Sequence, residues 1–225
     1  MPRPTAKKGR ESGFLSAFSP PVRSRLEAEM SETAFPSGAL LFQHGDPGDG
    51  CYFLRDGRVM LYAKKPDGTR KIFDILGAGD ILGEMSLIDG EPRCASAEAV
   101  TEVRAGFLPA GAFEKVVLSD PASTKALLRI LVTRLRRTDV QIEELVFLGV
   151  PGRLARALLT LGDRFREPGG AELIPLKHNE IADIVGTTRE YVSRFLAQFQ
   201  RDECLRLDRG SIEILSRERL ETWIN

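Results

Sequence analysis

The residues whose types and spacing could do chemistry lie in one short stretch, which reads GEMSLIDGEPRCA from Gly83 to Ala95. Glu84 offers a carboxylate that can accept hydrogen bonds from the vicinal hydroxyls of a ribose. Arg93 offers a planar, permanently charged fork that suits a phosphodiester anion. Gly83 lacks a Cβ, so its backbone can approach a ligand closely. The stretch predicts a site for a sugar and one negative charge; the alternative is a turn with a Glu84–Arg93 surface ion pair, worth about 0–1 kcal/mol.

Composition limits the classes of function that are open to the chain. Its 225 residues, 42% of them hydrophobic, suffice for one or two domains with a core in each. The formal net charge is zero, so nucleic-acid binding would need a local cluster of charge. The 3 cysteines, Cys51, Cys94 and Cys204, lack C-x-x-C spacing, which argues against a disulfide framework or a zinc site. We find no secretory signal and no apolar run of about 18 residues, and therefore expect a cytoplasmic protein without a membrane partner.

The first half of the chain has the pattern of a small antiparallel β-structure. We expect a disordered tail over 1–13 and a domain over 14–119, with a short helix starting near Pro21. Between 34 and 108, short apolar runs alternate with turn sequences such as GDPGDG and KPDGT, a pattern typical of an antiparallel sandwich or roll. The Gly45–Gly50 loop lacks the lysine of a P-loop, which favours turn chemistry there.

The period of the apolar residues changes over 120–149. Leucines and an isoleucine step by three and four, with Thr138 as the one polar residue, along Leu128, Leu131, Leu135, Thr138, Ile142 and Leu145. This heptad seam predicts a parallel coiled coil and a homodimer, while a helix lying on its own domain would use the same residues. Thr138 and Asp139 would cost stability at such a seam unless a ligand gave them partners. The segment 148–152, LGVPG, reads as a hinge.

The last domain, over 150–225, contains the pattern of a helix-turn-helix between Lys177 and Phe199. Asn179 could cap the first helix, and Thr187 or Thr188 the second. The expected core comprises Ile181, Ile184, Val185, Val192 and Phe195, and the expected exposed face of the second helix carries Thr188, Arg189, Glu190, Ser193 and Arg194. Arginine and glutamate side chains can read guanine and cytosine in the major groove, although a charged face is often only solvated. Residues 204–215 predict a hairpin wing, with Arg209 as a phosphate contact.

These motifs together resemble the cyclic-AMP receptor protein and fumarate-nitrate-reduction regulator family of bacterial transcription factors. GEMSLIDGEPRCA is similar to its phosphate-binding cassette, and IVGTTREYVSR, from Ile184 to Arg194, to its recognition segment. The resemblance implies an α+β protein with an antiparallel β-roll that binds a cyclic nucleotide, a long dimerisation helix and a winged helix-turn-helix. Implied partners are a cyclic purine nucleotide, double-stranded DNA with TGTGA-like half-sites and RNA polymerase, with no catalytic, metal or prosthetic group.

The resemblance also implies which residues hold the nucleotide: Gly83, Glu84, Met85, Arg93, Cys94, Ala95, Arg134, Thr138 and Asp139. In it, Arg134 pairs with Glu84, Thr138 meets the adenine amine and Asp139 reaches in from the other subunit. Arg134, Arg136 and Arg137 could instead form a solvated face. Asp139 and Cys94 depart from the usual residues, and a carboxylate could accept from the two donors of guanine. We therefore expect cyclic AMP as the ligand, with cyclic GMP a close second.

Two other classes of function remain as alternatives. A redox or gas sensor on the same scaffold would need clustered cysteines for an iron–sulfur site, and the three cysteines are far apart in the sequence. An enzyme would need a catalytic constellation, and the chain has only His44 and His178 and no paired carboxylates in a shared motif. We therefore expect no enzymatic activity.

Overall fold

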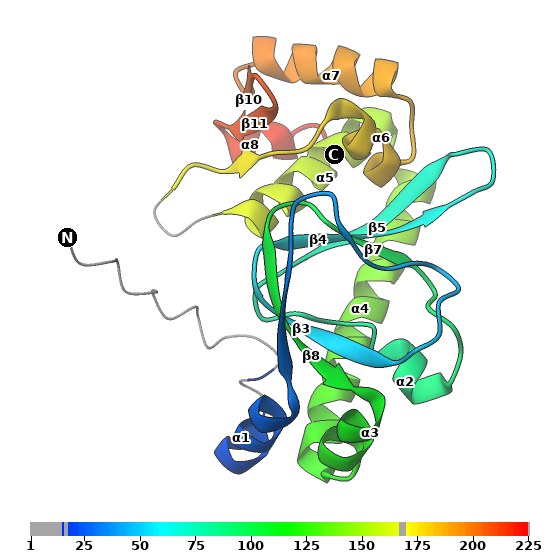
Figure 1. Cartoon of the computed structure of the whole chain (residues 1–225). Helices are drawn as coiled ribbons and strands as arrows, with labels where there is room; N and C mark the ends of the chain where they lie inside the picture. Colours follow the sequence, from blue (N-terminus) through cyan, green and yellow to red (C-terminus); the bar gives the residue numbers. More distant parts are fainter. Residues whose placement is uncertain (1–14, 16–17, 167–169, 225) are drawn as a thin grey trace. The chain divides into compact units, whose positions relative to one another are not determined.

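The structure is a computed structural model that describes residues 15, 18–166 and 170–224 (Figure 1). The predicted tail over 1–13 lies outside the described residues. The described residues form two compact units, one within residues 15–63 and 76–134 and the other within residues 64–75 and 135–224. Along the described residues, every helix is too short or too polar to pass through a lipid bilayer.

The first unit contains the predicted antiparallel β-structure. The strands of this β-structure are β1 (Ser31–Phe35), β2 (Leu40–Phe42), β3 (Gly50–Asp56), β4 (Arg58–Lys64), β5 (Arg70–Gly77), β6 (Ile81–Leu82), β7 (Ser96–Ala99) and β8 (Val103–Pro109). Residues 64–75, which include most of β5, are grouped with the second unit. They form two four-stranded sheets with the orders β1-β8-β3-β6 and β2-β7-β4-β5. Pairs such as β3 with β8 and β4 with β7 are antiparallel. The expectation of an antiparallel β-domain is therefore confirmed.

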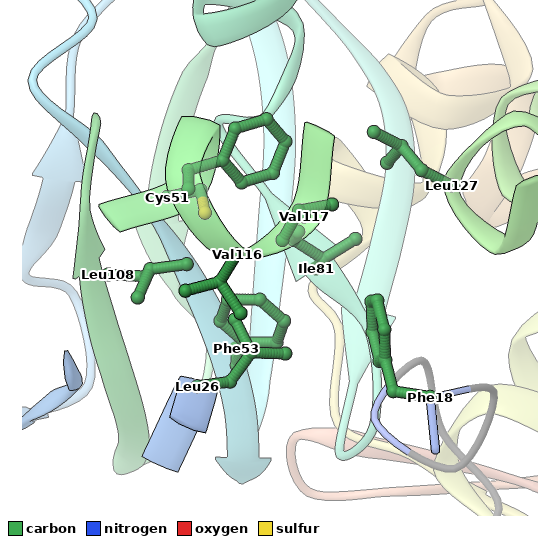
Figure 2. Packing of buried hydrophobic residues seen from close by; sticks show 10 residues of the cluster. Phe18, Leu26, Cys51, Phe53, Ile81, Leu108, Val116, Val117 and Leu127 are labelled. Atoms are coloured by element: carbon green, nitrogen blue, oxygen red, sulfur yellow. The ribbon is translucent and has the colours of Figure 1, made fainter. Parts of the chain in front are cut away.

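Two apolar clusters hold this unit together. One cluster joins residues of both sheets, including Leu54, Val59 and Ala97. The other packs β3, β6 and β8 against the helical segments α1 (Pro20–Glu29), α3 (Ala110–Phe113), its π-helical continuation η2 (Glu114–Leu118) and α4 (Pro121–Phe147). Figure 2 shows this second cluster, in which Phe53 of β3 lies among side chains from the helices. Successive side chains of a strand point to opposite faces, so Phe53 of β3 enters the cluster with the helices while Leu54 enters the cluster between the sheets.

The hairpin between β4 and β5 turns where the sequence predicts. Lys65 N–H donates to the Thr69 carbonyl at 2.9 Å, and Gly68 N–H donates to the Lys65 carbonyl at 3.0 Å. Gly68 adopts a φ of +89°, which a residue with a Cβ would adopt only with strain. The Asp67 carboxylate accepts from Thr69 N–H at 2.8 Å, and its hydrogen bonds with the Thr69 backbone and side chain lower its pKa.

Helix α4 runs through the predicted coiled-coil segment and crosses from the first unit into the second. Leu127 is buried in the first unit, and Leu131 packs against its helical cluster. Other apolar side chains along the helix are exposed, among them Leu128 at 55%, Leu135 at 61% and Ile142 at 55%. Exposed leucines repeated along a long helix are typical of an uncovered packing face.

The predicted hinge is shorter than expected. Only Leu148 and Gly149 lie between α4 and the next helix, α5 (Val150–Phe165). Pro151 belongs to the first turn of α5, where its missing N–H leaves no helical hydrogen bond unmade. The expectation that Val150–Gly152 lies in the linking segment is therefore wrong.

The second unit contains the predicted helix-turn-helix and wing. After α5 it comprises β9 (Leu173–Ile174), α6 (His178–Val185), α7 (Arg189–Arg201), β10 (Leu205–Asp208), β11 (Ser211–Ile214) and α8 (Arg217–Glu221). The wing is a sheet of order β10-β11-β9, in which the two-residue β9 adds a strand that the sequence reasoning did not anticipate. Gly186 ends α6 with a φ of +74°, a backbone conformation that glycine adopts without strain.

Two details of the helix-turn-helix differ from expectation. Lys177, and not Asn179, is the N-cap of α6, and its N–H donates to the Glu180 carboxylate at 2.7 Å. The core of the motif is closed by Leu196 and Phe199, both fully buried, whereas Phe195 and Ile184 are only half-buried. The difference arises because α7 presents its 192, 196 and 199 positions inward, a spacing of four and three.

We expect Phe113→Ala to lower the free energy of unfolding of the first unit by about 3–5 kcal/mol, because the ring is buried in the helical cluster. Leu40→Ala, at an exposed strand position, is the control and should change it by less than about 1 kcal/mol. Urea denaturation followed by circular dichroism measures both. Equal effects of the two substitutions would contradict this account of the core.

Candidate nucleotide site and DNA interface

The backbone at Gly83 fixes the geometry of the predicted cassette. It follows β6 with a φ of +83°, and a Cβ built there would lie 2.7 Å from Nη1 of Arg93. A side chain at this position would therefore meet both backbone strain and a steric clash. The short helix α2 (Met85–Asp89) follows and ends at Gly90. The glycine thus lets the chain turn tightly around the arginine.

Glu84 is buried, with 1% of its surface exposed. Its Oε1 accepts a hydrogen bond from Nη1 of Arg134, whose Nη2 donates to the Ile81 carbonyl. Its Oε2 is buried without a hydrogen-bond partner among the described residues. Burial raises the pKa of the carboxyl, and the nearby Arg134 guanidinium opposes this shift. The structure therefore brings together Glu84 and Arg134, as the resemblance implies.

Arg93 is also buried, at 2% exposed, and its fork is bound within the protein. Nη1 donates to the Gly83 carbonyl at 2.5 Å, and Nη2 donates to the Gly50 carbonyl at 2.7 Å and to Oδ1 of Asp49 at 3.0 Å. The guanidinium lies 4.6 Å above the ring centre of Phe42. Nε is buried with no hydrogen-bond partner among the described residues. The alternative of a Glu84–Arg93 surface ion pair is wrong, because both side chains are buried and each is paired with another residue.

The Gly45–Gly50 loop belongs to this site, which the sequence reasoning missed. Gly45 N–H donates to the Arg93 carbonyl, and Arg93 N–H donates to the Asp46 carbonyl, both at 2.9 Å. A Cβ on Gly48 would lie 2.6 Å from Cβ of Ser86 in α2, so this glycine permits close packing. The sequence signal was the density of glycine and aspartate in GDPGDG, which exceeds what a single turn requires.

The remaining predicted cassette residues lie beside these buried charges. Met85 and Cys94 are exposed, with Sγ of Cys94 3.9 Å from Sδ of Met85, and Ala95 is buried.

Cys51 is buried, and burial raises the pKa of its thiol well above the ordinary value. Among the described residues, no group of three or more histidine, cysteine or carboxylate side chains could hold a metal ion.

Thr138 and Asp139 lie farther along α4, four and five residues after Arg134, and both are exposed. They belong to the second unit, whereas the cassette belongs to the first. Their contact with a nucleotide base therefore stays a prediction.

The predicted DNA-reading face lies at the start of α7 (Figure 1). Oγ1 of Thr188 accepts from the Tyr191 N–H at 3.5 Å and caps the helix, as expected. Arg189 and Glu190 are exposed, and hydrogen bonds to its own backbone N–H and to Thr188 lower the pKa of Glu190. The Arg194 guanidinium is exposed and lies 4.6 Å above the Tyr191 ring centre, which restricts its orientation.

Ser193 differs from the other residues of this face because it is half-buried. Its Oγ lies 2.9 Å from Nδ1 of His178 in α6. Burial, reinforced by the Arg189 charge, lowers the pKa of His178 and favours the neutral imidazole, which can accept from the serine hydroxyl. The hydroxyl therefore holds α6 to α7, a role that the sequence reasoning did not assign.

A cavity of about 470 Å³ separates this face from the wing. Lys177, His178 and Arg189 line it from the helix-turn-helix, and Asp208, Gly210 and Ser211 line it from the hairpin. Arg209 is exposed at the turn of the wing, before Gly210 with its φ of +89°. The cationic side chains of the lining, Lys177 and Arg189, come from the helix-turn-helix, whereas the hairpin contributes the acidic Asp208.

Comparison with known proteins finds a family match for the region of each site. The cyclic nucleotide-binding domain family matches residues 32–120, and the Crp-like helix-turn-helix domain family matches residues 152–223. A CRP-like cAMP-activated global transcriptional regulator from Mycobacterium tuberculosis is 37% identical over 212 residues, covering 93% of this chain and 95% of the relative. The chain belongs to the CRP/FNR family of transcriptional regulators. This family consists of regulators and not of enzymes.

Further members of the CRP/FNR family are similar over most of their length. A cyclic AMP receptor protein from Thermus thermophilus is 33% identical over 187 residues, covering 83% of this chain and 85% of the relative. The crystal structure of a CRP/FNR-family transcriptional regulator from the same organism has a TM-score of 0.74 at 29% identity, covering 86% of this chain and 96% of that one. The predicted α+β fold, with a β-domain before a helix-turn-helix, is confirmed.

We expect Arg134→Met to destabilise the first unit by about 3–5 kcal/mol at pH 7, because it leaves the buried Glu84 carboxylate without its cation. Arg136→Met, at an exposed position of the same helix, should have little effect. Removing Arg134 raises the pKa of Glu84 further, so the stability deficit of Arg134→Met should grow as the pH rises from about 4.5 to 7. Urea denaturation at several pH values measures the deficit. A deficit that stays constant with pH would contradict the pairing.

Proposed function

We propose that this member of the CRP/FNR family binds a cyclic purine nucleotide and then, as a homodimer, a palindromic DNA site. Cyclic AMP is the first candidate ligand and cyclic GMP the second. The observation that carries the proposal is the pair of buried atoms without partners among the described residues, Oε2 of Glu84 and Nε of Arg93. One is an acceptor and the other a donor, and each costs about 1–3 kcal/mol while unpaired.

A cyclic nucleotide has the groups that these two atoms need. A ribose hydroxyl can donate to Oε2 of Glu84, whose Oε1 is already bound to Arg134. The phosphodiester oxygens can accept from the Arg93 guanidinium, which is held by the Gly83 and Gly50 carbonyls. The ligand would thereby satisfy a donor and an acceptor that the protein leaves unpaired. Gly83, Met85, Cys94 and Ala95 complete the proposed cassette.

The base is assigned to Thr138 and Asp139 on α4. Adenine has one exocyclic amine, which can donate a hydrogen bond to a threonine hydroxyl oxygen. Guanine has two adjacent N–H donors, which suit a carboxylate. Cyclic AMP stands first because the Mycobacterium tuberculosis relative is cAMP-activated. Asp139 keeps cyclic GMP as the second candidate.

The homodimer is proposed from the apolar side chains of α4. Leu128, Leu135, Ile142 and Leu145 are exposed at heptad spacing, and a second copy of the helix would bury them. Two copies related by a two-fold axis would present two α7 helices to half-sites about 34 Å apart, one turn of DNA. TGTGA-like half-sites, RNA polymerase as a further partner and a cytoplasmic location belong to the same proposal.

Nucleotide control of DNA binding requires that the ligand favour one arrangement of the chain over another. The short link at Leu148 and Gly149 between α4 and α5 is the proposed pivot. A complete switch from 1% to 99% active would need about 5.5 kcal/mol of differential binding. We expect a smaller value.

We expect Arg93→Ala to weaken binding of cyclic AMP by about 10-fold to 150-fold, because charge-assisted hydrogen bonds are worth about 1.5–3 kcal/mol. Titration calorimetry with cyclic AMP and cyclic GMP measures this and ranks the two ligands. Arg104→Ala, which removes an exposed arginine from the same unit, is the control. Circular dichroism and light scattering check that each variant is a folded dimer. If the folded Arg93→Ala variant binds as tightly as the unmodified chain, the cassette assignment is wrong.

We expect Arg194→Ala to lower discrimination between the best DNA site and its base-substituted variants by about 1–3 kcal/mol, without changing nucleotide affinity. Arg209→Ala, at the tip of the wing, should weaken binding to all sequences alike and reduce the dependence on salt. Fluorescence anisotropy at several salt concentrations separates the two effects. The reverse pattern would show that base reading and phosphate contact have been assigned to the wrong arginines.

A further inference from the structure

Arg93 meets an anion of the protein itself. Its described partners are the Gly83 and Gly50 carbonyls, the Phe42 ring and the Asp49 carboxylate. Among them only Asp49 is exposed, with 72% of its side chain accessible, while the Arg93 side chain is almost fully covered. An anion that approaches this guanidinium from solvent therefore meets the field of the Asp49 carboxylate as well as that of the arginine.

The position of Asp49 is fixed by the fold. Its carbonyl accepts from the Ala110 N–H at 2.9 Å, and β3 begins at the next residue, Gly50. On its other side, Gly48 packs closely against Ser86 of α2. The aspartate is thus anchored between a strand and a helix, and its carboxylate is held 3.0 Å from Nη2 of Arg93.

The two ion pairs of the cassette leave little positive charge for a ligand. Asp49 pairs with Arg93, and Glu84 pairs with Arg134, so the formal charges of these four side chains sum to zero. The energy of a bound anion in the field of Asp49 is proportional to the charge of the anion. A dianion is therefore opposed about twice as strongly as a monoanion at the same place.

We propose that Asp49 is a specificity-determining residue that selects a phosphodiester monoanion against a phosphomonoester dianion. The inference rests on the proposed function, because it assigns the charge selectivity of the same site. A cyclic nucleotide carries one negative charge, whereas a phosphomonoester such as AMP carries nearly two at pH 7.5, its second pKa being about 6. The exposed carboxylate favours the cyclic form by opposing the extra charge of the open one.

Competition against a fluorescent cyclic nucleotide tests the proposal at pH 7.5 and low salt. The unmodified chain, Asp49→Asn, Asp49→Glu and a charge control, Glu91→Gln, are each titrated with cyclic AMP and with AMP. Glu91 is exposed and lies two residues before Arg93, so its removal changes the local charge without touching the Asp49–Arg93 pair.

Removing the Asp49 charge should tighten cyclic AMP binding about threefold, within the range measured for exposed ion pairs. The gain for AMP should be about ninefold, because doubling the ligand charge doubles the energy and squares the ratio. The selectivity for cyclic AMP over AMP should therefore fall about threefold in Asp49→Asn. It should stay within twofold of the unmodified value in Asp49→Glu and Glu91→Gln.

Three results would overturn the inference while leaving the proposed function intact. One is equal weakening of both ligands by Asp49→Asn, which would show that Asp49 only positions Arg93. Another is a selectivity that Asp49→Asn leaves unchanged. This includes the case in which AMP displaces the fluorescent nucleotide from neither the unmodified chain nor Asp49→Asn. A third is the same loss of selectivity in Glu91→Gln, which would indicate general charge and not this contact. Failure of the unmodified chain to bind any cyclic nucleotide would instead refute the proposed function.

Discussion

A buried guanidinium and a buried carboxylate, nine residues apart in the sequence, set the main constraint on the first unit. Arg93 and Glu84 are almost fully removed from water, and a buried charge is tolerated only when other groups replace its hydration. Carbonyls of Gly83 and Gly50 and the Asp49 carboxylate do this for the arginine, while Arg134 does it for the glutamate. The tight glycine turn, the loop before β3 and the middle of α4 all contribute groups to these contacts.

The same constraint explains why the site is incomplete as a set of hydrogen bonds. Each charged group keeps one buried atom without a partner among the described residues. Their partners within the protein fix the orientation of both groups, so little conformational freedom remains to be lost when a ligand binds. In the proposed function, the nucleotide supplies the missing partners at a site that is already ordered, with the Asp49 charge limiting which anions fit.

Helix α4 has two distinct parts along its length. Its first part contributes Leu127 to the helical cluster and Arg134 to the pair with Glu84. Its later part carries exposed apolar residues together with Thr138 and Asp139. In the proposed mechanism, one continuous helix therefore connects the cassette arginine partner with the dimer face. The second unit is held by its own core around Val192, Leu196 and Phe199, which keeps the α7 arginines on the outer face.

Sequence alone determined the alternation of strands and turns, the long helix and the helix-turn-helix, because these depend on periodicity and on local turn chemistry. It also singled out Glu84 and Arg93 as one compact motif and limited the cap of the second helix to Thr187 or Thr188, of which the structure uses Thr188. It did not determine the role of the Gly45–Gly50 loop, the Ser193–His178 contact or the closing of the core by Phe199. Those depend on which distant segments meet, and only tertiary packing decides that. Asp49 and Arg93 are 44 positions apart, and no local pattern connects them before the fold brings a carboxylate to a guanidinium.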